Sequence, residues 1–244
     1  MNPQDANKAE QPAGPTLEDL IHEAESAVGE RPRTIAFMRA SAMAMARGDV
    51  EKAVALAERI DDPYERKIQT SVVLYQAALK ELRSGRIDQA CHYAAGIEFM
   101  PQRVAVFHRV AQKLWASKEP DRARARLEEI WEWTGKNDNN PQKVDAMLKL
   151  TNTMSQHDTE RGFQFLQAAI RVVNATDFSY EPPDGQRISV EVHIAPDMLD
   201  FDSVFGVLAR ADLERAHSAA QLLTSQEFAL LADTIVWHQL STAK

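Results

Sequence analysis

The chain has 244 residues, of which 44% are hydrophobic, only 9 are glycine and 11 are proline. A fold built only of strands needs frequent turns, so this shortage of turn-forming residues argues against it and favours helices. The 28 basic and 36 acidic side chains give a net charge of −8, which repels a phosphate backbone and argues against nucleic-acid binding. The single cysteine excludes an intramolecular disulfide and fits a reducing compartment.

The beginning of the chain differs from the rest in composition. It is polar, contains Pro3, Pro12 and Pro15, and shows no hydrophobic periodicity, so we expect a disordered tail over residues 1–15. It contains no apolar stretch like that of a secretory signal, and no later run approaches the ~20 apolar residues of a membrane span. We therefore expect a cytoplasmic protein without membrane contact.

From residue 16 the chain alternates helix-forming segments with short breaks. Thr16 and Asp19 have the spacing of a capped helix start. The acid pair Asp61-Asp62 before Pro63 is explained as the N-terminal cap of a helix rather than as a metal site. Helices are expected over residues 17–28, 32–48 and 50–60, and from Pro63 to about Gly85.

A repeat with an offset of 37 residues organises this region. The segment 48–53 (GDVEKA) matches the segment 85–90 (GRIDQA), and Ile60 and Ile97 keep the same offset. Weaker copies start at Lys118, His157 and Ala211. The small and apolar residues that follow in these copies are Ala123, Leu127 and Ile130; Gly162, Leu166 and Ala169; and Ala216, Ala220 and Leu223. Such a period is typical of stacked helix hairpins.

This pattern resembles the tetratricopeptide-repeat family. That family places a Gly five residues before a small Ala and apolar residues four and seven positions further on. The matching residues here are Gly48, Ala53, Ala57 and Ile60, and again Gly85, Ala90, Ala94 and Ile97. Ser41 and Ala78 supply the small residue that the family has seven positions before the Gly. The resemblance covers about residues 31–175 and, more weakly, 198–241. It departs from the family because most aromatic positions of the first helix are missing and the repeats exceed ~34 residues.

The resemblance implies a stack of antiparallel helix pairs whose surface binds a protein or peptide. The C-terminal part is also similar to uncharacterised bacterial helical-repeat proteins, which implies nothing about function. We therefore predict an all-α fold, a solenoid of about five helix pairs. It comprises a helical-repeat region at 16–175, an insertion at 176–197, and a C-terminal repeat and cap at 198–244.

The insertion breaks the helical pattern. Prolines and Asp184-Gly185 predict a turn, and the apolar residues of 188–194 alternate strictly with polar ones, which is the period of a strand. We predict a small β insertion near 178–194. Its strand at 188–194 pairs either with 178–181 or with the same strand of a second copy in a homodimer.

Signatures of catalysis are missing from the sequence. No two of the nine glycines lie closer than 11 residues, which excludes Gly-rich phosphate loops and a nucleophile elbow. The usual spacings of zinc and calcium ligands are also missing. Cys91 and His92 are neighbours on a helix and point apart, so they form no nucleophile–base pair, and we expect Cys91 in or near the core. We predict no catalytic residue, no metal and no cofactor.

A basic segment is the best candidate for contact with a partner. Residues 101–126 contain seven basic and two acidic side chains. Arg122 and Arg126 share a helix face, which suits an acidic peptide, although a solvated helix surface with i, i+4 partners is the favoured explanation of these charges. Trp133 either packs against the next hairpin or acts as a recognition aromatic. The predicted partner-binding residues are Arg103, Arg109, Lys113, Arg122, Arg126 and Trp133.

These observations favour a non-catalytic interaction module that binds an unidentified protein or peptide, with an acidic partner as the best match. One alternative is an enzyme or small-ligand binder with its site in the solenoid groove or under residues 177–197. Another is a structural protein that assembles with copies of itself through the 177–197 segment.

Overall fold

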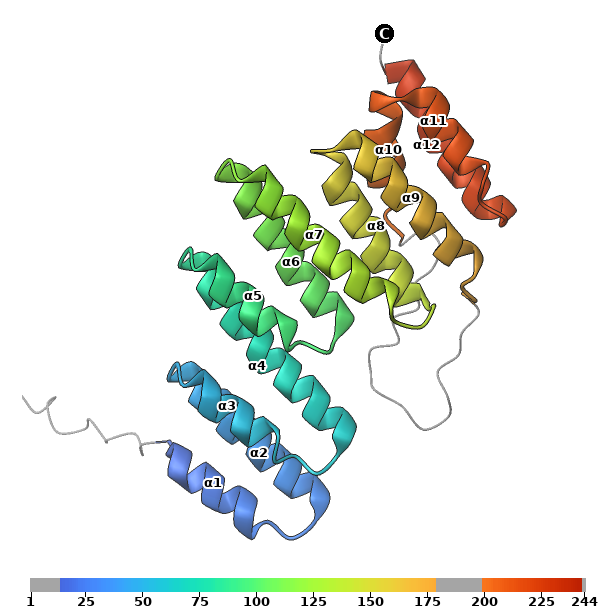
Figure 1. The fold of residues 1–244 in the computed structure, drawn as a ribbon. Coiled ribbons are helices and arrows are strands. Elements are labelled where there is room, and N and C mark those ends of the chain that lie inside the picture. Colours follow the sequence, from blue (N-terminus) through green and yellow to red (C-terminus); the bar gives the residue numbers. More distant parts are fainter. Residues whose placement is uncertain (1–13, 179–198, 243–244) are drawn as a thin grey trace, which may run out of the picture.

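The computed structural model describes residues 14–178 and 199–242, and within these ranges it contains twelve α-helices and no strand (Figure 1). The all-α prediction is therefore confirmed for the described part of the chain. The predicted strand at 188–194 and nearly all of its predicted partner at 178–181 lie outside the described residues, as does most of the predicted tail at 1–15.

The helices follow one another as neighbouring antiparallel pairs. α1 (Leu17–Ser26) precedes the pairs, and α12 (Gln226–Thr242) follows them. The pairs are α2 (Glu30–Ala46) with α3 (Val50–Ala57), α4 (Pro63–Arg83) with α5 (Ile87–Ala95), α6 (Met100–Ala116) with α7 (Pro120–Gly135), α8 (Pro141–Ser155) with α9 (Thr159–Asn174), and α10 (Phe201–Ala211) with α11 (Leu213–Ala220).

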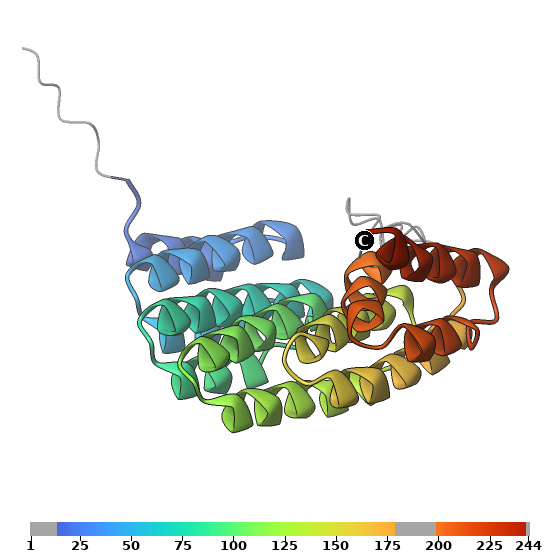
Figure 2. The same ribbon diagram turned by 90° about the horizontal axis from the view of Figure 1, so that it is seen from above.

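The pairs stack into two layers, which Figure 2 shows from above. The first helices α2, α4, α6, α8 and α10 pack directly on one another in chain order. Each second helix packs on its own partner and on the first helix that follows it, as α3 packs on α4 and α7 on α8. We call the layer of first helices the first-helix layer. A helical stack of this kind presents an extended surface to solvent along each layer.

The predicted helix starts are confirmed. Thr16 and Asp19 hydrogen-bond reciprocally at the start of α1. Asp62 accepts a hydrogen bond from the backbone N–H of Glu65 at 2.7 Å and thereby caps α4. Asp61 pairs with Arg33 at 2.9 Å. The acid pair therefore has the structural role that its place before a proline predicts.

Three successive turns share one backbone conformation. Gly48, Gly85 and Lys118 have φ of 85°, 80° and 62°, and the next residue in each turn donates its N–H to the carbonyl five positions back. This left-handed cap satisfies helix-end carbonyls and suits glycine, because an L side chain is strained there. The turns at Gly48 and Gly85 thus reproduce the 37-residue offset read from the sequence, and the third turn follows 33 residues later with Lys118 in the place of a glycine.

Replacing Lys118 with Gly should therefore raise the free energy of unfolding by about 0.5–1 kcal/mol, because the strain of the left-handed conformation is removed. Lys118 is exposed, so little packing is lost. Lys118→Ala is the control, since it removes the same charge and keeps the strain. Urea denaturation measures both variants, and an equal gain for Ala would show that the backbone conformation is not the cause.

The repeat positions form the core. In all five copies the small and apolar residues after the turn are buried, from Ala53, Ala57 and Ile60 in the first copy to Ala216, Ala220 and Leu223 in the last. Ser41 and Ala78 are fully buried where the two helices of a pair meet, and the hydroxyl of Ser41 donates to the carbonyl of Ala53 at 2.8 Å.

Within the described residues, no helix is both long and apolar enough to cross a membrane.

Candidate binding groove between α6 and α8

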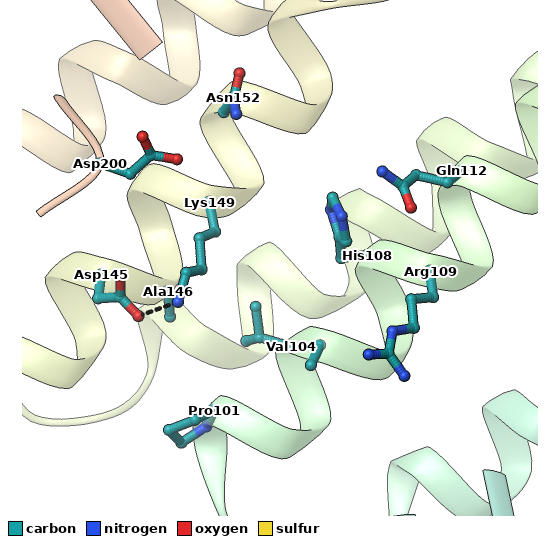
Figure 3. Close-up of a pocket in the computed structure, with 11 residues that line it drawn as sticks. Pro101, Val104, His108, Arg109, Gln112, Asp145, Ala146, Lys149, Asn152 and Asp200 are labelled. Atoms are coloured by element: carbon teal, nitrogen blue, oxygen red, sulfur yellow. Dashed lines mark hydrogen bonds and ion pairs between the residues drawn. The ribbon is translucent and has the colours of Figure 1, made fainter. Parts of the chain in front are cut away.

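A cavity of about 440 Å³ lies between α6 and α8, two neighbours in the first-helix layer (Figure 3). We call it the α6–α8 groove. Val104 and Ala146 are its buried apolar lining, and Asp200 borders it from the start of α10. The other lining residues are Pro101, Ala105, His108, Arg109 and Gln112 of α6, and Asp145, Lys149 and Asn152 of α8.

Helical spacing brings these side chains together. Asp145, Lys149 and Asn152 lie at i, i+4 and i+7 on α8, and therefore on one face of that helix. The lining residues of α6 follow the same spacing from Pro101 through Ala105 to His108 and Gln112. Because α6 and α8 are adjacent, the two stripes face a common space.

His108 is held in one tautomer by its neighbour on α8. Its Nδ1 lies 2.7 Å from the hydroxyl oxygen of Thr153, and that hydroxyl donates its only hydrogen to the carbonyl of Lys149 at 2.8 Å. The Nδ1–H of His108 must therefore be the donor, which leaves Nε2 as an acceptor. Burial lowers the pKa of His108, and the charges of Arg109 and Lys149 lower it further. At pH 7 the groove thus holds a neutral imidazole.

The groove lining has two basic side chains, Arg109 and Lys149, and two acidic ones, Asp145 and Asp200, but only one pair of them forms an ion pair. Lys149 pairs with Asp145 at 2.7 Å, as the dashed line in Figure 3 marks. Asp200 accepts from the backbone N–H of Ser203 at 3.3 Å and so caps α10. Arg109 is exposed and has no ion-pair partner in the described part of the chain. One guanidinium therefore remains available to an anionic group that enters the groove.

The six predicted binding residues do not form one surface, and only Arg109 lines the groove. Arg103 and Trp133 do meet: the guanidinium of Arg103 lies 4.2 Å from the ring centroid of Trp133. Both side chains are half-buried, and burial lowers the pKa of Arg103 below its ordinary value. Trp133 therefore packs against α6 of its own pair, in a cation–π contact that stabilises the pair.

The other three predicted residues bind groups within the stack. Arg122 and Arg126 of α7 both reach the carboxylate of Asp88 on α5, at 2.9 and 3.5 Å. Each also pairs with an acid on its own helix or at its start, Glu119 for Arg122 and Glu129 for Arg126. The ammonium of Lys113 donates to the carbonyl of Leu82 at 2.6 Å and so caps the end of α4. Their role in partner binding stays a prediction.

Sequence reasoning missed all polar groove residues except Arg109, namely His108, Gln112, Asp145, Lys149, Asn152 and Asp200. Their spacing could have predicted the residues of α6 and α8. They lie on one face of each helix, at positions where neither the turns nor the hydrophobic core calls for a particular residue type. Cys91 is buried as predicted, and burial raises the pKa of its thiol, which disfavours the reactive thiolate form. The described residues contain no group of three His, Cys, Asp or Glu that could hold a metal ion.

Comparison of the chain with protein-family models, with curated proteins and with solved structures found no match. A proposal for function therefore rests on the geometry of the chain itself.

Proposed function

We propose that this chain is a non-catalytic, tetratricopeptide-like interaction module that binds an acidic segment of a protein partner in the α6–α8 groove. The observation that carries the proposal is the exposed guanidinium of Arg109, which has no ion-pair partner among the described residues and lies beside a cavity of about 440 Å³. A carboxylate that pairs with this guanidinium gains a charge-assisted hydrogen bond without displacing an existing one.

The other polar groups of the groove suit a peptide main chain. Nε2 of the neutral His108 can accept a backbone N–H, and the amides of Gln112 and Asn152 can both donate and accept. These groups come from two helices on the surface of the first-helix layer, so a segment lying across α6 and α8 meets all of them. The volume lies in the range of sites that hold small ligands or a few side chains.

The basic surface of α7 is the less favoured place for the same partner. Arg122 and Arg126 share Asp88 and each has a second acidic neighbour, so an incoming carboxylate must compete with carboxylates already bound. Exposed ion pairs are weak, at about 0–1 kcal/mol each, so this competition lowers affinity without forbidding binding. The two surfaces can be separated by experiment.

Selection of random peptides on the full chain tests the proposal. We expect the selected peptides to be rich in Asp and Glu and to bind more weakly as salt rises. Arg109→Glu should weaken them roughly tenfold or more, because a charge-assisted contact becomes a repulsion. The matched control, Arg122→Glu with Arg126→Glu, should leave binding within about twofold.

Two results contradict the proposal. Loss of binding in the double variant alone would move the site to α7. Selected peptides without acidic residues, or no selection above background, would refute an acidic-segment binder.

A small anionic ligand is the second candidate for the same groove, favoured by the fixed His108–Thr153 pair in a cavity of ligand size. In this case peptide selection fails, whereas a dicarboxylate such as succinate raises the melting temperature of the parent chain and not that of Arg109→Glu.

A further inference from the structure

A second cavity, of about 550 Å³, lies in the other layer of the stack, between the second helices α3 and α5. We call it the α3–α5 groove. Most of its lining is apolar or small: Val50, Val54, Ala55, Leu74, Ala95 and Gly96. The polar lining residues are Glu51 and Glu58 of α3, and His92 and Tyr93 of α5. The described lining thus contains two carboxylates and no Lys or Arg.

Arginine side chains join neighbouring second helices along the rest of the stack, in which these helices follow one another as Figure 1 shows. Each reaches back to a carboxylate of the preceding second helix. The pairs are Arg122 and Arg126 of α7 with Asp88 of α5, Arg161 of α9 with Glu128 of α7, and Arg215 of α11 with Glu160 of α9. Among the described second helices, only the neighbours α3 and α5 are joined by no such ion pair.

The repeat explains why this ion pair is missing. Glu51 stands three positions after the turn at Gly48, as Asp88 stands three positions after the turn at Gly85. Arg122 and Arg126 stand four and eight positions after the next turn, at Lys118. The corresponding residues of α5 are Gln89 and Tyr93. The first pair therefore keeps the carboxylate, while the second pair lacks the arginines that would bind it.

The arginines of α9 and α11 have a second partner besides the carboxylate. The guanidinium of Arg215 lies 4.3 Å from the ring centroid of Phe163, and that of Arg161 lies 5.6 Å from the ring centroid of Phe165. The α3–α5 groove offers the same two kinds of partner, the carboxylate of Glu51 and the half-buried ring of Tyr93. A planar guanidinium suits both of them, because it pairs with carboxylates and stacks on aromatic rings.

We propose that the α3–α5 groove binds a segment of a protein partner that carries an arginine beside apolar residues. The guanidinium takes the place between Glu51 and Tyr93, and the apolar side chains cover Val54 and Leu74. Glu58 lies two turns further along α3, roughly 10 Å from Glu51 at 1.5 Å rise per residue, and receives a second basic residue. Neither carboxylate has an ion-pair partner in the described part of the chain. The proposal is independent of the α6–α8 groove, which lies in the first-helix layer.

Selection on the full chain from a library of random peptides that contain no Asp or Glu tests the proposal. We expect peptides with arginine beside apolar residues, whose binding weakens with salt. Glu51→Gln with Glu58→Gln should raise the dissociation constant of a selected peptide roughly tenfold or more, at unchanged helicity, because both side chains are exposed. The matched control is Glu132→Gln with Glu214→Gln. It removes the same charge from exposed positions on two other second helices and should leave binding within about twofold.

A variant that supplies the missing arginine within the chain gives the second test. Gln89 is exposed and corresponds to Arg122, so Gln89→Arg should place a guanidinium at Glu51 and weaken the selected peptide roughly tenfold by competition. Gln76→Arg adds the same charge at an exposed position of α4 outside the groove lining, and it should leave binding within about twofold.

Four results would overturn the proposal. They are a selection that enriches no arginine, equal losses in the two glutamate double variants, unchanged binding in Gln89→Arg, and self-association of the parent chain that Gln89→Arg abolishes. The last result would make a second copy of this chain the occupant of the groove.

Discussion

Replacing Lys143 with Met should lower the free energy of unfolding by about 3 kcal/mol, as measured by urea denaturation. Lys143 is only 4% exposed, and its ammonium donates to the carbonyls of Gly135 and Asn137, at 2.9 and 2.6 Å, and to the side chain of Asn139 at 3.1 Å. These acceptors stand at the end of α7 and in the loop to α8. Met keeps the length of the side chain but leaves three acceptors without their donor.

Lys149 provides the matched control on the same helix. Its side chain is 54% exposed, and its contact is an i, i+4 pair with Asp145. Lys149→Met should therefore change the free energy of unfolding by less than about 0.5 kcal/mol. Equal losses in the two variants would show that the connections of Lys143 to the end of α7 do not stabilise the fold.

The helical stack could be predicted from the sequence because its requirements recur at fixed positions. A left-handed turn favours Gly at 48 and 85, and close contact between paired helices favours small residues such as Ala53 and Ala90. Each requirement is local, so the same residue types recur in the sequence at a regular offset. The recurrence of glycine fails at Lys118, where a lysine adopts the same left-handed backbone conformation at an energetic cost.

The candidate site could be predicted only in part, because its chemistry depends on contacts between repeats. Counting charges over residues 101–126 gives a basic segment, but Asp88 of the preceding pair forms ion pairs with both Arg122 and Arg126 across the stack. The groove likewise joins Arg109 to Lys149, which are forty positions apart along the chain. A linear count cannot distinguish a charge that is paired between repeats from one that is not.

The fourth pair, α8 with α9, has a different turn from the first three pairs but packs in the same stack. The turn between α8 and α9 contains no left-handed residue, and both His157 and Asp158 donate to the carbonyl of Met154. The glycine of this pair stands instead inside α9, at position 162, where it is buried against Ser155. Its role is therefore close approach of the two helices rather than turn formation.

Gly162→Ala should lower the free energy of unfolding by about 2 kcal/mol, although alanine is the better helix former by up to about 1 kcal/mol. A methyl group at position 162 would lie 2.8 Å from the Cα atom of Ser155, and it would also meet the Ser155 hydroxyl. Because one of the obstructing atoms belongs to the backbone, a change of rotamer cannot relieve the contact, and α8 must move away from α9.

Gly206→Ala supplies the control with the opposite expected sign. Gly206 is also a buried glycine inside a helix, α10, but an added methyl group would meet only the side chain of Gln239, at an ordinary distance of 3.5 Å. The helix preference of alanine should therefore dominate and raise the free energy of unfolding by about 0.5–1 kcal/mol. Denaturant midpoints that move in opposite directions in the two variants would attribute the loss at Gly162 to the α8–α9 contact. A gain at both positions would show that the two helices separate at little cost.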